Sequence, residues 1–465
     1  MKKNERFIVQ RDRRNFIKNT ALVSFSFLAL TRCSVKDILI NDSKLGVDLI
    51  PDPENYLNLP YGFDYKIISR SGEMMEDGFL VPGRPDGMGT FEGASSNEVI
   101  LVRNHENNPR PLSNSPFGPS NELLDKIAPI KIYDTGNMES PGLGGTTTMI
   151  YNETAQVLER QFLSLAGTYR NCAGGITPWG SWLSCEEDVT TKGGLAEKDH
   201  GFIFEVPAGS RETVNPAPIE EMGRFNHEAV AVHPDTSIVY MTEDRSDGLI
   251  YRYIPNVKER LHLGGQLQVL SILDRKGFDT RNWEVETVIE NTQYEVKWLD
   301  IDDVRSAKDD LRYQGFENGA ARFARGEGIW FGDCELYFAC TNGGSGKWGQ
   351  IFKYRPSPDE GQETVSSTSG TLELFVESRD RNVLNMCDNL TVAPWGDLMV
   401  CEDNGGRNRI LGIRPDGSIY TFALNRGSHS EFAGIVFSPS GKTMFVNIQE
   451  NGHTLAITGP WETLT

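Results

Sequence analysis

Acidic side chains recur beside short apolar runs in this chain of 465 residues. Residues 172–188 and 388–403 show the pattern most clearly: a thiol or acid, an apolar run, the turn Pro-Trp-Gly, a second apolar run, and an ending in Cys-Glu-acid. Further copies begin at Glu228, Glu327 and Glu431, and residues 97–106 supply one more acidic ending. If equivalent positions meet in space, the carboxylates repel one another unless cations intervene. The repeat therefore predicts a metal site, with the following ligands: Glu106, Cys172, Glu186, Glu187, Glu228, Glu243, Glu327, Asp388, Glu402 and Asp403.

The donor types restrict the choice of metal. Carboxylate and amide oxygens favour Ca²⁺, Mg²⁺ or Mn²⁺. Cys172 occupies the position that the other copies fill with an acid, and a thiolate there indicates iron or another transition metal beside the hard ions. The alternative is a buried structural thiol.

Two arginines precede the copy at Glu327. Arg322 and Arg325 flank Phe323-Ala324, so we expect at least one of them at the rim of the acidic site. A guanidinium there would bind phosphate oxygens in bidentate fashion, and the alternative is a salt bridge to a neighbouring carboxylate.

The elements that must position these residues are short. Each copy is a predicted β-hairpin, two apolar runs around a turn, and the copies start 43 to 99 residues apart. Because a period of roughly 50 to 60 residues is typical of four-stranded blades, and an insertion accounts for the longest gap, we predict an all-β, six-bladed propeller. It forms a single domain over residues 59–465, with a polar insertion near residues 255–315. A two-sheet sandwich is the alternative.

Charge and the first residues bear on location. The net charge of −19 and the lack of a Lys/Arg-rich run exclude a nucleic-acid partner. Arg13-Arg14-Asn15-Phe16-Ile17-Lys18 and the apolar residues 21–30 match a twin-arginine signal over residues 1–33. A linker follows over residues 34–58. We therefore expect a protein exported by the twin-arginine translocase to the periplasm or outer surface, with or without a lipid anchor at Cys33. We expect a monomer with few or no disulfides.

Several motifs resemble one family. They include Asn171-Cys172-Ala173-Gly174-Gly175-Ile176-Thr177-Pro178-Trp179-Gly180, Asn104-His105-Glu106, Asn226-His227-Glu228-Ala229 and Ser430-Glu431-Phe432-Ala433-Gly434. Together they are similar to the motifs of PhoX-type alkaline phosphatases, over roughly residues 59–461. The chain has Arg325-Gly326-Glu327-Gly328 where that family is expected to have Arg-Pro-Glu-Gly.

The resemblance implies a six-bladed propeller that hydrolyses phosphate monoesters outside the cytoplasm, using iron (Fe³⁺) and calcium (Ca²⁺). It implies that Cys172, Glu228 and Glu327 bind iron and that Arg325 holds the phosphate. Calcium would be bound mainly by Glu186, Glu187, Asp388, Glu402 and Asp403. Two rival functions are an exported, non-catalytic calcium-binding propeller and a calcium propeller that hydrolyses another ester, such as a lactone.

Overall fold

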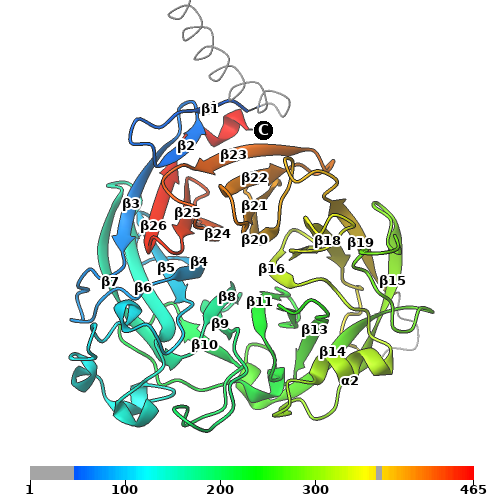
Figure 1. The fold of residues 1–465 in the computed structure, drawn as a ribbon, viewed down its shortest axis with the longest axis horizontal. Coiled ribbons are helices and arrows are strands. Elements are labelled where there is room, and N and C mark those ends of the chain that lie inside the picture. The colour runs from blue at the N-terminus through cyan, green and yellow to red at the C-terminus, as the bar shows by residue number, and fades with distance from the viewer. Residues whose placement is uncertain (1–46, 363–368, 465) are drawn as a thin grey trace, which may run out of the picture.

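The computed structural model describes residues 47–362 and 369–464, so the predicted signal region and Cys33 lie outside the described residues. Within the described part, no helix is both long and apolar enough to cross a membrane. The fold is an all-β, propeller-like ring of sheets around a central axis (Figure 1). A propeller is therefore confirmed over a two-sheet sandwich.

Within residues 47–362 and 369–464, five hydrogen-bonded sheets make up the ring. One sheet contains β4 (Pro85–Glu92), β5 (Glu98–His105), β6 (Gly144–Asn152) and β7 (Val157–Thr168). A second contains β8 (Asn171–Ile176), β9 (Ser181–Glu186) and β10 (Ile203–Pro207). A third contains β24 (Phe432–Phe437), β25 (Thr443–Ile448), β26 (His453–Thr458) and β3 (Asp64–Arg70). A fourth contains β1 (Leu49–Ile50), β2 (Leu57–Pro60), β23 (Ile419–Asn425), β22 (Arg409–Ile413), β21 (Leu398–Glu402) and β20 (Cys387–Val392).

The fifth sheet has nine strands and differs from separate blades. In spatial order it contains β11 (His227–Val232), β12 (Val239–Glu243), β13 (Ile250–Pro255), β14 (Gly265–Ile272), β15 (Gln293–Asp300), β19 (Gly370–Glu377), β18 (Gln350–Arg355), β17 (Leu336–Cys340) and β16 (Gly326–Phe331). The predicted polar insertion is therefore partly sheet, because β14 and β15 fall within it and β15 pairs with both β14 and β19.

Helices are short and lie in the connections. The one α-helix of the described residues is α2 (Leu311–Asn318), which ends at Gly319 in the left-handed conformation. The 3₁₀ turns are η1 (Leu112–Asn114), η2 (Leu124–Lys126), η3 (Pro129–Lys131), η4 (Gly136–Met138), η5 (Glu220–Met222), η6 (Leu261–Leu263) and η7 (Trp461–Thr463).

The two hairpins predicted around the Pro-Trp-Gly turns are present in the structure. Gly180 and Gly396, the glycines of the two Pro-Trp-Gly turns, have φ angles of +84° and +100°, a backbone conformation that favours glycine. Each turn is closed by a backbone hydrogen bond, from Thr177 to Ser181 and from Ala393 to Asp397, both of 2.8 Å. The turns thus return β9 and β21 toward the ends at which β8 and β20 begin.

Six inner strands surround the axis. β4 contacts β8, β8 contacts β11, β11 contacts β16, β16 contacts β20, β20 contacts β24, and β24 contacts β4 again. Apolar cores lie between neighbouring sheets; for example, Met399 and Tyr420 of one sheet pack with Phe432 and Val446 of the next. The last sheet is closed by β3, which pairs with β26 although they are far apart in the sequence. This closure fixes the ring that positions the site.

Candidate active site

Two sets of side chains, most of them acidic, line the central cavity, and we call them the first and the second level. At the first level, each inner strand carries one ligand-type side chain at or next to its first residue: Asp86, Cys172, Glu228, Glu327, Asp388 and Glu431. At the second level, the residue that follows the neighbouring strand also lines the cavity: Glu106, Glu187, Asp244, Asp403 and Gln449. The antiparallel pairing of each hairpin brings the two levels to the same end of the ring.

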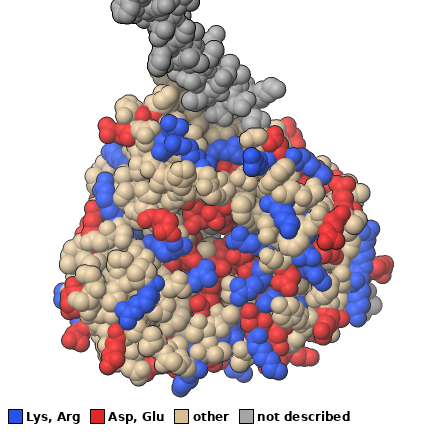
Figure 2. Space-filling model, in the orientation of Figure 1, with Lys and Arg blue, Asp and Glu red and all other residues tan. Residues whose placement is uncertain are grey.

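The cavity has a volume of about 160 Å³ and is strongly charged. Its lining consists of the eleven residues just named and three arginines, Arg84, Arg170 and Arg325. Figure 2 shows acidic and basic side chains gathered around the hollow at the centre of the ring. The structure therefore brings together seven of the ten ligands predicted from the sequence, and Arg325 with them.

Three predicted ligands lie elsewhere. Glu186, Glu243 and Glu402 are the last residues of β9, β12 and β21, and they are not among the lining residues. Their neighbours Glu187, Asp244 and Asp403 point into the cavity instead. Successive residues of an extended chain point to opposite faces, so only one acid of each pair can face the axis. The structure thus places Glu186 and Glu402 outside the cavity although the prediction grouped them there with Glu187 and Asp403, and it places Asp244 in the cavity where Glu243 was predicted.

Each of the three carboxylates has a structural role. Glu186 accepts hydrogen bonds from the backbone of Tyr169 and Gly201 at 2.9 Å, and it contacts the His200 ring at 2.7 Å. Glu243 accepts bonds from the backbone of Leu249 and the Tyr251 hydroxyl.

Glu402 is also held by partners outside the cavity. It accepts a bond from the backbone of Asn385 and pairs with Arg409 at 2.6 Å. These buried acids therefore anchor loops of the ring outside the cavity.

Arg322 is the other predicted site residue that does not reach the cavity. Its guanidinium lies over the ring of Phe316 in α2, 3.6 Å from the ring centroid, and its Nε is 4.0 Å from Asp279. Arg322 therefore belongs to the packing of α2 against the ring.

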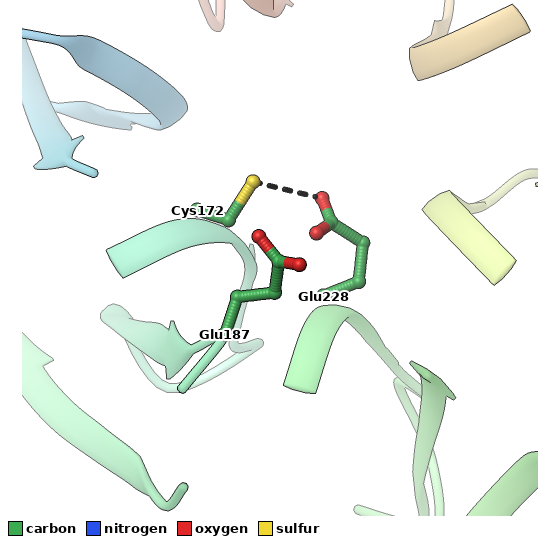
Figure 3. Close-up of side chains that lie close together, drawn as sticks. All are labelled: Cys172, Glu187 and Glu228. Atoms are coloured by element: carbon green, nitrogen blue, oxygen red, sulfur yellow. Dashed lines mark hydrogen bonds between the residues drawn. The ribbon is translucent and has the colours of Figure 1, made fainter. Parts of the chain in front are cut away.

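Cys172 is the centre of the first cluster of potential metal ligands. Its thiol donates a hydrogen bond of 3.3 Å to Oε1 of Glu228, and Glu187 points toward both (Figure 3). A second cluster consists of Glu228, Glu327 and Asp388, and in each cluster the ligand atoms lie within 4.8 Å of one another. Glu228 belongs to both clusters, so one carboxylate can connect two ions.

Burial and mutual repulsion disfavour the charged form of the clustered acids. Burial, followed by repulsion from neighbouring acids, raises the pKa of Glu187, Glu228, Glu327, Asp388 and Glu431 well above the usual range. Burial and Glu106 raise the pKa of Asp86 to about 7. Burial also raises the pKa of Cys172. Oε2 of Glu228 is buried with no hydrogen-bond partner. An orphaned carboxylate oxygen among crowded acids fits a bound cation.

The three arginines are tied to second-level acids. Arg325 donates from Nε and Nη2 to Asp244 at 2.7 and 3.1 Å, and from Nη2 to Glu327 at 2.6 Å. Arg170 joins Glu106 and Glu187, while Arg84 joins Glu106 and Glu450. Attraction by Glu327 is the main cause that raises the pKa of Arg325. All three therefore stay charged at the mouth of an acidic cavity.

Several lining residues escaped the prediction from sequence: Arg84, Asp86, Arg170, Asp244, Glu431 and Gln449. Two had a usable signal, because Glu431 begins the fifth copy of the repeat and Asp244 follows Glu243 as Glu187 follows Glu186. Asp86 had none, since Arg84-Pro85-Asp86-Gly87 lacks the apolar run that marks the other copies.

The fold is similar to that of a solved structure with a known ligand. PhoX of Pseudomonas fluorescens, in complex with vanadate as a transition-state analogue, is 20% identical with a TM-score of 0.67, covering 89% of this chain and 98% of that chain. A gluconolactonase from Xanthomonas campestris is 10% identical with a TM-score of 0.40, covering 89% and 97%. An auxiliary nutrient binding protein from Bacteroides ovatus is 10% identical with a TM-score of 0.43, covering 86% and 77%. The first likeness supports the fold, and the other two are too distant to support an argument.

Sequence comparison decides the family. No curated protein matches the chain significantly. The sequence profile of the family described as alkaline phosphatase PhoX matches residues 45–452, which include every residue of the cavity. The chain therefore belongs to the alkaline phosphatase PhoX family and is a metal-dependent phosphoric ester hydrolase.

Proposed function

We propose that the central cavity hydrolyses phosphate monoesters outside the cytoplasm, using a mixed cluster of iron and calcium. The observation that carries the proposal is the position of Cys172, a thiol at one place of a ring whose other metal-ligand donors are oxygens. A thiolate suits iron, and carboxylates suit calcium.

The proposed ligands follow the two clusters. Cys172, Glu187 and Glu228 would hold iron, and Glu228, Glu327 and Asp388 would hold a neighbouring ion. Asp86, Glu106, Asp403 and Glu431 add carboxylates for further calcium. When bound, the cations would supply Lewis acidity to the phosphoryl group.

The protein's own groups would bind and orient the substrate. Arg325 has donors that match phosphoryl oxygens, and its rigid ties to Asp244 and Glu327 orient the guanidinium before the substrate arrives. Among the described residues, the lining contains no serine, threonine or histidine. Its other possible nucleophiles, the Cys172 thiol and the carboxylates, are the proposed metal ligands or the partners of the arginines. Attack by water therefore fits this set of residues better than attack by a side chain.

The finer architecture and location are also part of the proposal. We count the nine-stranded sheet as two blades, β11–β14 and β16–β19, joined by β15, which makes six blades with one inner strand each. The twin-arginine pattern at Arg13-Arg14 supports export. A lipid anchor at Cys33 would place the cavity near a membrane surface.

Metal analysis combined with an activity assay tests the function. We expect the purified protein to contain both iron and calcium and to release phosphate from p-nitrophenyl phosphate, and a chelator to abolish that release. Calcium without iron, together with no phosphate release, would contradict the proposal. Hydrolysis of a lactone by that calcium form would establish the rival ester hydrolase.

A further inference from the structure

Arg170 is a structural copy of Arg325. Arg170 stands two residues before Cys172, and Arg325 stands two residues before Glu327. Both have a left-handed backbone, with φ angles of 44° and 53°. This conformation is strained for a residue other than glycine, and such strain concentrates at functional sites.

The surrounding backbone holds both arginines in the same way. The amide of Arg170 donates to Asn107, and its carbonyl accepts from Glu187, at 3.0 and 2.9 Å. The amide of Arg325 donates to Arg245, and its carbonyl accepts from Thr341, at 2.9 and 3.0 Å. The backbone of each arginine is thus hydrogen-bonded on one side to the end of the preceding hairpin and on the other side to the end of the hairpin that the arginine itself begins.

The side chains repeat the pattern. Arg170 donates from Nε and Nη2 to Glu106 at 2.9 and 2.8 Å, and from Nη2 to Glu187 at 2.6 Å. Arg325 uses the same two nitrogens for Asp244 and Glu327. Among the residues that the structure describes, Nη1 of neither arginine has a hydrogen-bond partner. Their side chains are 30% and 28% exposed at the mouth of the cavity.

We propose that Arg170 is a second phosphoryl-binding residue, and that Arg170 and Arg325 hold one phosphate group between their Nη1 donors. The inference rests on the proposed function of the cavity. β11 separates the inner strands of the two arginines, so the guanidinium groups approach the axis from two directions. A phosphoryl group has three peripheral oxygens, which two guanidinium groups can contact at once.

Arg84 provides the contrast. It also has a positive φ, of 46°, but its Nη1 pairs with Glu450 and its Nη2 with Glu106. Glu106 accepts from Arg84 and Arg170 alike, so Arg84 fixes the carboxylate that orients Arg170. Arg84 is therefore a positioning residue.

Inhibition by inorganic phosphate tests the assignment. We compare the inhibition constants of the wild-type enzyme, Arg170→Lys, Arg325→Lys and the double variant, each with its metal content measured. Lysine keeps the charge but loses the fork of donors, so each single change should weaken phosphate binding by about tenfold to a hundredfold. The double variant should be weaker still. Arg379→Lys, an ion-paired arginine outside the cavity, is the matched control and should bind phosphate as the wild type does.

Chemical rescue separates binding from a structural role. In Arg170→Ala, added guanidinium should restore phosphate binding in part, whereas methylammonium of the same charge should not. Unchanged phosphate inhibition in Arg170→Lys, or an Arg170→Ala variant that guanidinium does not rescue, would refute the assignment. If the wild-type enzyme hydrolyses no phosphate ester, the proposed function fails. Calorimetric titration of the same variants with inorganic phosphate then still decides whether Arg170 binds this anion.

Discussion

At the scale of single residues, the thiol of Cys172 sets this cavity apart from an ordinary acidic pocket. It lies against Glu228, whose second oxygen is buried without a hydrogen-bond partner. Substituting Cys172 by Ser or Ala should remove the proposed iron and lower phosphatase activity at least about a hundredfold, because loss of a metal ligand costs no less than loss of the groups that orient it. Elemental analysis and phosphate release measure both effects.

The control for this prediction is another cysteine. Cys334 is exposed and unpaired, and it lies outside the cavity. Cys334→Ser should keep both metal content and activity. A Cys172→Ala variant with full activity and bound iron would show that the thiol is only a packing residue.

The protonation of the buried His200 ring makes the stability of the protein depend on pH. Burial alone would lower the pKa of His200, but Glu186 and Asp134 outweigh it and raise the pKa from 6.5 to about 9. The folded state therefore binds the proton more tightly than the unfolded state. The charged ring contributes about 3 kcal/mol below pH 6.5, and this contribution is lost as the pH rises through about 9.

Urea unfolding over a pH series checks this prediction. The wild-type protein should lose its advantage over His200→Gln between about pH 6.5 and pH 9. His429→Gln, which changes an exposed histidine, should follow the wild type throughout. A constant difference between the wild type and His200→Gln would contradict the assigned protonation.

At the scale of elements, two adjacent acids at the end of the second strand of a hairpin have different roles: one stabilises the fold and the next lines the cavity. Glu402 is the last residue of β21 and pairs with Arg409, whereas the next residue, Asp403, lines the cavity. Glu402→Gln should cost about 3 kcal/mol of unfolding free energy because it breaks a buried ion pair. Asp403→Asn should leave the stability of the metal-free protein nearly unchanged and should lower phosphate release. Denaturant titration and the activity assay compare the two variants, and equal stability losses would contradict this division of roles.

The same elements show what the sequence can and cannot predict. The Pro-Trp-Gly turns and the acidic endings are local, so the hairpins and the approach of Cys172, Glu228, Glu327 and Asp388 were predictable. Which acid of each adjacent pair faces the axis depends on the strand register, which the apolar pattern alone does not define at a strand end. The pairing of β15 with β19 joins distant segments, and no local pattern records it.

At the scale of the whole molecule, the cavity brings together side chains from all six inner strands, a thiol from β8 and carboxylates from the other five. Cations that bind only the folded ring should stabilise it by mass action, by about 4 kcal/mol when free metal exceeds the dissociation constant a thousandfold. Chelation should therefore lower the melting temperature in calorimetry, and added calcium should restore it in part. An unchanged melting temperature would show that the ring does not depend on its ions.

The pairing of β3 with β26 has a consequence for biosynthesis. Residues 64–70 pair with residues 453–458, which are synthesised much later. β24, which follows Glu431 in that same sheet, completes the circle of inner strands. During synthesis the lining of the cavity is therefore incomplete until Glu431 and Gln449 have been added, and contacts between such distant segments form slowly. The cavity can therefore take its complete form only after β24, β25 and β26 have joined the ring.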